Sequence, residues 1–263
     1  ATFGYTVWLR ANDAFLGNGV AAKGALATRM GLSGVPAIAE TIALNTLFEL
    51  VRDTGARMHL CRLSSAAGIE LVRRARAEGL PVTCDVSVNQ LHLTDIDIGY
   101  FNPSMRLSPP LRQQRDRDAI RAGLADGTID ALVSDHTPVD ADAKNLPFAE
   151  SEPGATGLEL LLALALKWGA ETGLSLPAAL ATVTSGPVRV LGKTLGTLGA
   201  SAGRLVEGGV ADLCVFDAAA HWTVSPDALR SQGKHTPFSG HELQGRVHAT
   251  LVAGNIAFES ARR

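Results

Sequence analysis

The stretch that decides the fold is DALVSDHTPVD, residues Asp130–Asp140. Its apolar run Ala131–Val133 is short and uninterrupted, which is typical of a strand buried on both faces. The run ends abruptly in Ser134–His136, so we expect Asp135 at the carboxyl end of a parallel strand. In (β/α)8 barrels the catalytic groups lie at these strand ends. The stretch therefore predicts a parallel α/β fold and marks Asp135 as a candidate catalytic residue.

The same order of strand and helix extends over most of the chain. We expect strands at Tyr5–Leu9, Arg57–Leu63, Leu80–Val86 and Ile129–Ser134, and helices at Ala21–Met30, Pro36–Arg52, Ser65–Glu78, Arg115–Asp126 and Thr156–Gly169. Strands that alternate with helices pair in parallel. These units cannot close an eight-stranded barrel, so the sheet is open or a first half lies upstream of Ala1. In either case we expect the edge near Val7–Leu9 to be covered by another chain or by a further part of this one.

After Gly192 the sequence pattern changes to short β-rich runs that are interrupted by glycines. The segments GRLVEGGVADLCVFD and GRVHATLVAGNIAFES are the longest of these runs. We therefore expect two domains, a partial (β/α) barrel over residues 1–197 and a small β-rich domain over residues 198–263.

Composition limits the classes of function. The 263 residues are 46% hydrophobic and 19% charged, with a formal charge of −2, which gives no electrostatic footprint for nucleic acid or for an anionic membrane. No apolar run is long enough to span a bilayer. Cys61, Cys84 and Cys214 are far apart, which argues against a disulfide framework, so we expect a reducing, cytoplasmic location.

Five collinear motifs carry a resemblance to a known family. They are HLCRLSSAAGIELVRRARAEGLPVTCDVS from His59, RLSPPLR from Arg106, DGTIDALVSDHTP from Asp126, EPGATGLELLLALAL from Glu152, and the tail from Gly203 to Phe258. Together they resemble consecutive motifs of dihydroorotases, the cyclic amidohydrolases of pyrimidine synthesis. The resemblance implies the C-terminal half of a (β/α)8 barrel, about strands five to eight, followed by a small β-domain. It also implies zinc as the cofactor of the family.

Several residues at the functional positions depart from the family pattern. Asp135 matches the Asp that binds metal and shuttles a proton. Arg62 stands where the family has a zinc-binding His, Arg10 stands at the His of a His-x-Glu motif, and Asn89 falls where the family reads Pro-His-His. Ser108 replaces a substrate-binding Asn. A guanidinium stays protonated and offers no lone pair to a metal, so we expect no metal ligands in this chain and a vestigial pocket.

Three residues are candidates for binding a substrate. Arg112 is retained in RLSPPLR, and Thr156 and Gly157 belong to a GxTG loop that could present backbone N–H groups to a small ligand. Each also has a structural interpretation: Arg112 as an arginine that stabilises a loop, and Thr156 and Gly157 as part of a glycine-rich turn that precedes a helix. His59 lies three residues before Arg62 and would occupy the opposite face of the strand, so we expect it to be structural.

The two arginines lead to a geometric prediction. Arg10 and Arg62 end neighbouring strands on the expected active-site face, so both should approach Asp135 and supply the positive charge that it would otherwise lack. We therefore expect Arg62→His to destabilise the fold rather than restore zinc binding.

These departures favour a non-catalytic function. The chain resembles the dihydroorotase-like proteins that lack zinc ligands and assemble with aspartate transcarbamoylase, so we expect that partner, a homo-oligomer and a vestigial Asp135. The alternative is an active zinc dihydroorotase that interconverts dihydroorotate and carbamoyl aspartate, with further metal ligands supplied upstream of Ala1. A hydantoinase- or allantoinase-like enzyme is a third interpretation, which the PPLR and SDHTP runs fit less well.

Overall fold

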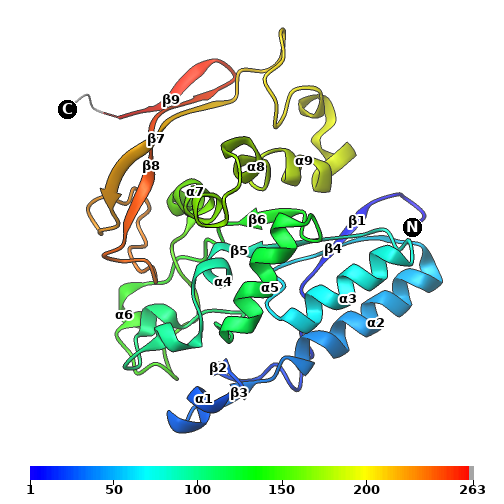
Figure 1. The fold of residues 1–263 in the computed structure, drawn as a ribbon, viewed down its shortest axis with the longest axis vertical. Coiled ribbons are helices and arrows are strands. Elements are labelled where there is room, and N and C mark those ends of the chain that lie inside the picture. Colours follow the sequence, from blue (N-terminus) through cyan, green and yellow to red (C-terminus); the bar gives the residue numbers. More distant parts are fainter. Residues whose placement is uncertain (261–263) are drawn as a thin grey trace.

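A four-stranded parallel sheet forms the centre of the computed structural model, which describes residues 1–260 (Figure 1). Its strands are β1 (Thr6–Leu9), β4 (Arg57–Leu60), β5 (Val82–Ser87) and β6 (Ala131–Val133), in the spatial order β1-β4-β5-β6. Most residues of β4 and β5 are buried, as expected for parallel strands that are covered on both faces. The predicted parallel α/β fold is confirmed, and within the described residues the sheet is open.

Two strands end earlier than the sequence predicts, and both end for the same reason. The run Arg57–Leu63 is extended only as β4, because Arg62 adopts a φ of 54° and turns the chain. The run Ile129–Ser134 is extended only as β6, and Asp135 follows at a φ of 49°. A left-handed backbone cannot continue a β-ladder. Both side chains therefore leave the strand direction at the carboxyl edge of the sheet.

Helices that follow the strands along the chain cover the sheet. The longer ones are α2 (Ile38–Thr54), α3 (Ala66–Ala77), α5 (Gln114–Ala125) and α7 (Leu161–Thr172), and the shorter ones are α4 (Val88–His92), α6 (Ala141–Lys144), α8 (Leu176–Ala181) and α9 (Ser185–Leu191). Contacts run in series from α2 through α3, α5, α4 and α7 to α8. In Figure 1, α2, α3 and α5 lie on one side of the strands, and α7, α8 and α9 lie on the other.

The predicted helix Ala21–Met30 is wrong in its first half. The segment instead forms β2 (Ala21–Ala22), which pairs in parallel with β3 (Gly34–Val35), and then the short helix α1 (Ala25–Arg29). The pairing needs a close approach of two backbones, since a Cβ on Gly34 would lie 2.8 Å from Lys23 Cα. This approach, which only glycine permits, overrides the helix propensity of the alanines.

The predicted β-rich tail is confirmed as an antiparallel sheet. It consists of β7 (Leu213–Thr223), β8 (Glu242–Val252) and β9 (Asn255–Glu259). Gly245, at a φ of 97°, lets β8 pack closely on α7, because a Cβ there would lie 2.5 Å from Leu166 Cδ1. The boundary predicted at residue 198 falls inside the 3-10 segment Gly192–Ala200, and the division into two domains stays a prediction.

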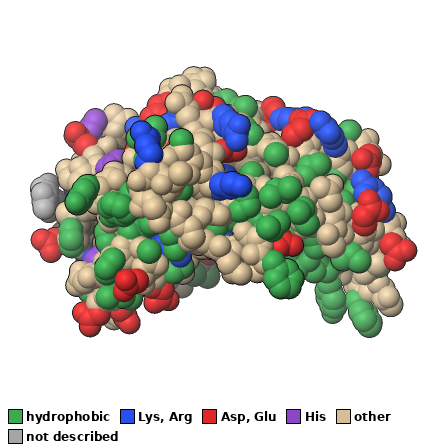
Figure 2. Space-filling view, turned by 90° about the horizontal axis from the view of Figure 1, so that it is seen from below, with side chains coloured by type: hydrophobic (Ala, Val, Ile, Leu, Met, Phe, Trp, Pro, Cys, Tyr) green, Lys and Arg blue, Asp and Glu red, His purple; other side chains and the backbone are tan. Residues whose placement is uncertain are grey.

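The surface mixes charges of both signs with exposed apolar side chains. Figure 2 shows Lys and Arg interspersed with Asp and Glu on one face of the molecule, with hydrophobic side chains between them. On and beside β1, the side chains of Phe3, Tyr5, Val7 and Trp8 are exposed. Within residues 1–260 the outer edge of β1 pairs with no strand, and no helix there is both long and apolar enough to cross a membrane.

Candidate functional site

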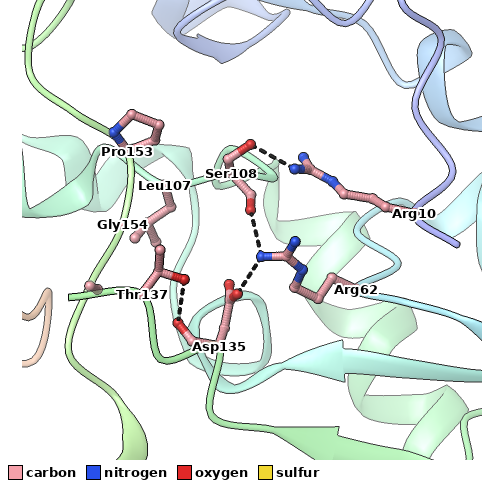
Figure 3. A pocket seen from close by; sticks show the side chains of 9 residues that line it. Arg10, Arg62, Leu107, Ser108, Asp135, Thr137, Pro153 and Gly154 are labelled. Carbon is pink, nitrogen blue, oxygen red and sulfur yellow. Dashed lines mark hydrogen bonds and ion pairs between the residues drawn. The ribbon is translucent and has the colours of Figure 1, made fainter. Parts of the chain in front are cut away.

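The carboxyl ends of β4 and β6, on either side of β5, bring Arg62 and Asp135 together across 73 residues of sequence. Arg62 Nη1 donates to Asp135 Oδ1 at 2.7 Å, as Figure 3 shows. The Asp135 side chain is 6% exposed and the Arg62 side chain is 31% exposed, so the ion pair is partly shielded from solvent. The predicted approach of Arg62 to Asp135 is confirmed.

Both partners of this ion pair have an unusual backbone. Arg62 and Asp135 have positive φ values of 54° and 49°, a region that residues other than glycine adopt rarely and at some energetic cost. The turn at Arg62 is held by its own N–H, which donates to Asp85 Oδ1 at 2.7 Å. A carboxylate on β5 therefore positions the arginine that pairs with the carboxylate after β6.

Arg10 follows β1 and lies beside Arg62 in the same pocket (Figure 3). Its Nη1 donates to Ser108 Oγ at 2.9 Å, while Arg62 Nη1 lies 3.4 Å from the Ser108 carbonyl oxygen. Burial, followed by the neighbouring Arg62 guanidinium, lowers the pKa of Arg10. The structure thus brings both predicted arginines to one pocket, but the hydrogen bond of Arg10 is made with Ser108 rather than with Asp135.

The pocket has a volume of about 210 Å³ and is closed on one side by the loop that precedes α7. It is lined by Arg10, Arg62, Leu107, Ser108, Asp135, Thr137, Pro153, Gly154 and Ala155. Gly154 adopts a φ of 150°, and a Cβ there would lie 2.5 Å from the Thr137 carbonyl oxygen. Glycine at this position therefore lets two segments of the wall pack against each other.

The donor set of this pocket does not fit a catalytic zinc ion. Such an ion is held by imidazole, thiolate or carboxylate groups that converge from several strands. The charged groups that line the pocket are the guanidinium groups of Arg10 and Arg62 and the single carboxylate of Asp135, whose Oδ1 already accepts from Arg62. Guanidinium nitrogens have no lone pair to donate. The lining residues of this chain therefore support no zinc-dependent step by themselves.

A separate group of potential metal ligands lies next to Arg62. His59, Cys61 and Asp85 place ligand atoms within 4.8 Å of one another. The ring nitrogens of His59 lie 2.9 Å from Asp85 Oδ2 and 2.8 Å from Thr83 Oγ1, which confirms that this histidine has structural hydrogen bonds. Burial, and then the Asp85 carboxylate, raises the pKa of Cys61 to about 11. A metal ion here would have to displace the proton of a thiol that burial keeps neutral.

Sequence reasoning missed this group because it treated the histidine and the cysteine separately. His59 and Cys61 are two residues apart on an extended segment, so their side chains share one face. The register pairs Leu60 with Cys84, which places Cys61 opposite Asp85 on the next strand. A His-x-Cys spacing followed by an acid on the neighbouring strand was the available signal.

Arg112 and Asn89 lie outside the lining of the pocket. Arg112 is buried, and its guanidinium donates to Ser64 Oγ at 2.9 Å and to the Val35 carbonyl oxygen at 3.4 Å. Asn89 is buried within α4. The structure therefore favours the structural interpretation of Arg112, and it does not bring Asn89 to the predicted pocket.

Thr156 and Gly157 anchor the loop before α7. Thr156 Oγ1 donates to the Gly233 carbonyl oxygen at 2.7 Å, which ties the loop to the segment between β7 and β8. The N–H of Gly157 donates to His136 Nδ1 at 3.2 Å. The loop reaches the pocket through Pro153, Gly154 and Ala155 rather than through the two residues predicted to bind substrate.

The chain is similar to proteins of a known family. A model of the amidohydrolase family matches residues 23–257. A dihydroorotase-like protein of Pseudomonas aeruginosa is 44% identical over 98% of this chain and 60% of its own length. A dihydroorotase of Anaeromyxobacter sp. (strain K) is 39% identical over 99% of this chain and 59% of its own length. These matches confirm the resemblance to dihydroorotases, and the chain spans about three-fifths of the length of these relatives.

Solved structures agree on the fold. An L-hydantoinase (dihydropyrimidinase) from Arthrobacter aurescens superposes with a TM-score of 0.86 and 25% identity, over 99% of this chain and 58% of that one. A dihydropyrimidinase from Brevibacillus agri superposes with a TM-score of 0.82 and 20% identity, over 98% of this chain and 57% of that one. The sheet and helices described above therefore follow the fold of cyclic amidohydrolases.

Proposed function

Because the chain belongs to the amidohydrolase family, we propose that it forms part of a dihydroorotase-like protein of pyrimidine biosynthesis that lacks dihydroorotase activity. The observation that carries the proposal is the 2.7 Å contact between Arg62 Nη1 and Asp135 Oδ1. Hydrolysis of a cyclic amide needs an activated water and a polarised carbonyl, which a metal supplies in this family. Here the Asp135 carboxylate, which would otherwise be available to such a metal, is paired with the Arg62 guanidinium.

The second part of the proposal concerns the partner. A chain that keeps the packing of the family but replaces its metal donors by arginines is suited to a role that depends on shape. The role implied by the resemblance is assembly with aspartate transcarbamoylase, in a complex that also contains further copies of this chain. The contacts of Arg62 support this role, because they connect the turn after β4 to β5 and to the turn after β6 without a metal.

The second candidate is an active zinc dihydroorotase. Two observations favour it: relatives named dihydroorotase are 39% identical to this chain, and the His59, Cys61 and Asp85 group could hold a metal ion. In that case further metal ligands would have to come from elsewhere in the protein, and the bound metal would have to compete with Arg62 for the Asp135 carboxylate. A hydantoinase-like function has less support, since the L-hydantoinase from Arthrobacter aurescens is only 25% identical to this chain.

The test of the catalytic part measures zinc and activity on the same full-length protein, produced with zinc in the medium. We expect substoichiometric zinc and no interconversion of dihydroorotate and carbamoyl aspartate above the buffer blank. Asp135→Asn should change neither value. Stoichiometric zinc that disappears together with activity in Asp135→Asn would establish the enzyme instead.

The test of the partner is sedimentation velocity of the full-length protein mixed with aspartate transcarbamoylase. We expect a boundary that sediments faster than either protein alone. Separate boundaries at all mixing ratios would reject the assembly role, while the conclusion about activity would still rest on the zinc and activity measurements.

A further inference from the structure

The pocket beside Asp135 contains more positive than negative charge. Its lining includes two guanidinium groups, of Arg10 and Arg62, and one carboxylate, that of Asp135. Asp135 is paired with Arg62, whereas the hydrogen bond of Arg10 goes to the neutral hydroxyl of Ser108. A guanidinium has five N–H donors, so Arg10 has donors to spare. The Asp135 and Glu40 carboxylates favour the charge of Arg10, but burial and the neighbouring Arg62 guanidinium outweigh them. A bound anion would supply a direct counter-charge, which lowers the cost of holding Arg10 in a partly buried site.

The size of the cavity limits what such an anion can be. Its volume of about 210 Å³ lies below the usual range of roughly 300–1,000 Å³ for drug-sized ligands. The nearby Asp135 carboxylate also disfavours a second negative charge on the ligand. The cavity is therefore suited to a small anion with a single charge, and not to a nucleotide.

The wall opposite the arginines is shaped to leave this space open. Figure 3 shows Arg10 and Arg62 on one side of the pocket, with Pro153, Gly154 and Thr137 facing them. A side chain at position 154 would meet the Thr137 carbonyl oxygen, so this part of the wall is bare backbone. The Ser108 hydroxyl lies between the two sides and already contacts Arg10.

We propose that this pocket binds a small, singly charged oxyanion of the carboxylate class, held by the Arg10 guanidinium beside the Arg62–Asp135 ion pair. The planar guanidinium matches a carboxylate with two parallel hydrogen bonds. In such a site cationic side chains surround an anion, whereas a metal centre places negative ligands around a cation. The proposal shares with the proposed function only the premise that arginines occupy the metal positions.

The first experiment probes Arg10 in the full-length protein after treatment with a chelator. Phenylglyoxal modifies free guanidinium groups, and peptide mass spectrometry follows the modification of Arg10 and of Arg115 in the same digest. Arg115 has a 78% exposed side chain outside the pocket and serves as the internal control. Acetate should slow the modification of Arg10 saturably, by about tenfold once its concentration exceeds the dissociation constant about tenfold, because the bound anion covers the guanidinium that the reagent attacks. The modification of Arg115 should not change.

Two further arms decide the class of the ligand. Chloride at equal ionic strength should give no saturable protection. At pH 8, where inorganic phosphate is mostly doubly charged, phosphate should protect less than acetate, because the Asp135 carboxylate disfavours a second negative charge. Equal protection by acetate and chloride would overturn the proposal, and stronger protection by phosphate would overturn the carboxylate class. These readouts involve neither activity nor the partner, and the zinc content of the same sample is measured separately, so a failure of the proposed function would be distinguishable.

A variant provides the independent check. Acetate should raise the melting temperature of the wild-type protein and of Arg115→Gln, but not that of Arg10→Gln. An equal rise in Arg10→Gln would place the anion elsewhere and overturn the proposal. If Arg10→Gln does not fold, the protection of Arg10 in the wild-type protein decides the question.

Discussion

At the scale of single residues, Arg62 combines three constraints. Its backbone N–H is held by Asp85, its φ is 54°, and its guanidinium pairs with Asp135. The side chain is 31% exposed, so solvent screens part of the interaction with Asp135. The contribution of the pair to stability should therefore lie below the roughly 3–5 kcal/mol that is lost when a fully buried pair is broken.

We predict that Arg62→His lowers the free energy of unfolding by about 1–3 kcal/mol, because it leaves the Asp135 carboxylate without its charged donor. Urea denaturation measures the loss. Asp135→Asn should cost a similar amount, and the double variant should cost less than the sum of the two single changes. Additive losses, or a gain of stoichiometric zinc with dihydroorotase activity in Arg62→His, would contradict this interpretation of the pair.

At the scale of elements, a buried carboxylate connects α2 to the start of α3. Glu40 Oε2 accepts from the N–H and the hydroxyl of Ser64 at 2.9 and 2.6 Å, and its Oε1 accepts from those of Ser65 at 3.0 and 2.6 Å. Gly68 leaves room for this carboxylate, since a Cβ there would lie 2.2 Å from Oε1. The contact fixes the loop that carries Arg62 towards the pocket.

We predict that Glu40→Gln destabilises the protein by about 2 kcal/mol, since one oxygen that accepts two hydrogen bonds becomes a donor facing donors. The free energy of unfolding in urea is the measurement. Glu49→Gln, on the same helix but with a 74% exposed side chain, is the matched control and should change stability by less than about 0.5 kcal/mol. Equal effects of the two changes would show that the hydrogen bonds of Glu40 contribute nothing specific.

A half-buried histidine connects α4 to α7 and should make the contact between them sensitive to pH. His92 Nε2 lies 2.9 Å from the Leu164 carbonyl oxygen, and burial lowers the pKa of His92 from 6.5 to about 4. The folded state therefore binds this proton more weakly than the unfolded state does. The stability contributed by the neutral ring is complete above pH 6.5 and is lost as the pH falls towards 4.

We predict that the free energy of unfolding falls by about 3 kcal/mol between pH 6.5 and pH 4 through this residue, from about 1.4 kcal/mol for each unit of pKa difference. Urea denaturation at several pH values measures the slope. His92→Gln should flatten it, while His248→Gln, at an exposed position, should leave it unchanged. A wild-type slope retained in His92→Gln would assign the pH dependence to other groups.

At the scale of the whole molecule, the edge of the sheet is the feature that most invites a partner. The outer side of β1 has no paired strand within the described residues, and Val7 and Trp8 are exposed on it. Unpaired N–H and C=O groups along an apolar edge form a template for pairing with another strand. The expected cover over Val7–Leu9 stays a prediction.

We predict that the 263-residue chain self-associates through this edge and that Val7→Lys shifts it towards the monomer, because a lysine on an edge strand opposes pairing. Sedimentation velocity over a range of concentrations measures the shift. Val206→Lys is the matched control, since Val206 and Val7 have similar exposed fractions of 44% and 42%. Identical sedimentation of the two variants would place the association on another surface.

The sequence by itself determined the parallel α/β order, the β-rich tail and the positions of Asp135 and Arg62 at strand ends. These features depend on the local period of apolar residues and on where a strand ends, and both can be predicted from residues that are close together in the sequence. The sequence also predicted that Arg10 and Arg62, which cannot bind a metal, would lie near Asp135, because a guanidinium stays protonated in any protein environment.

Only the tertiary structure decided which side chains meet. It joined His59, Cys61 and Asp85 through the register of β4 and β5, turned Arg112 towards Ser64, and anchored Thr156 to Gly233. It also replaced the first half of a predicted helix by the pair β2 and β3, through a backbone contact at Gly34. Contacts of this kind depend on the packing of elements far apart in the chain, where close approach and buried hydrogen bonds outweigh local propensity.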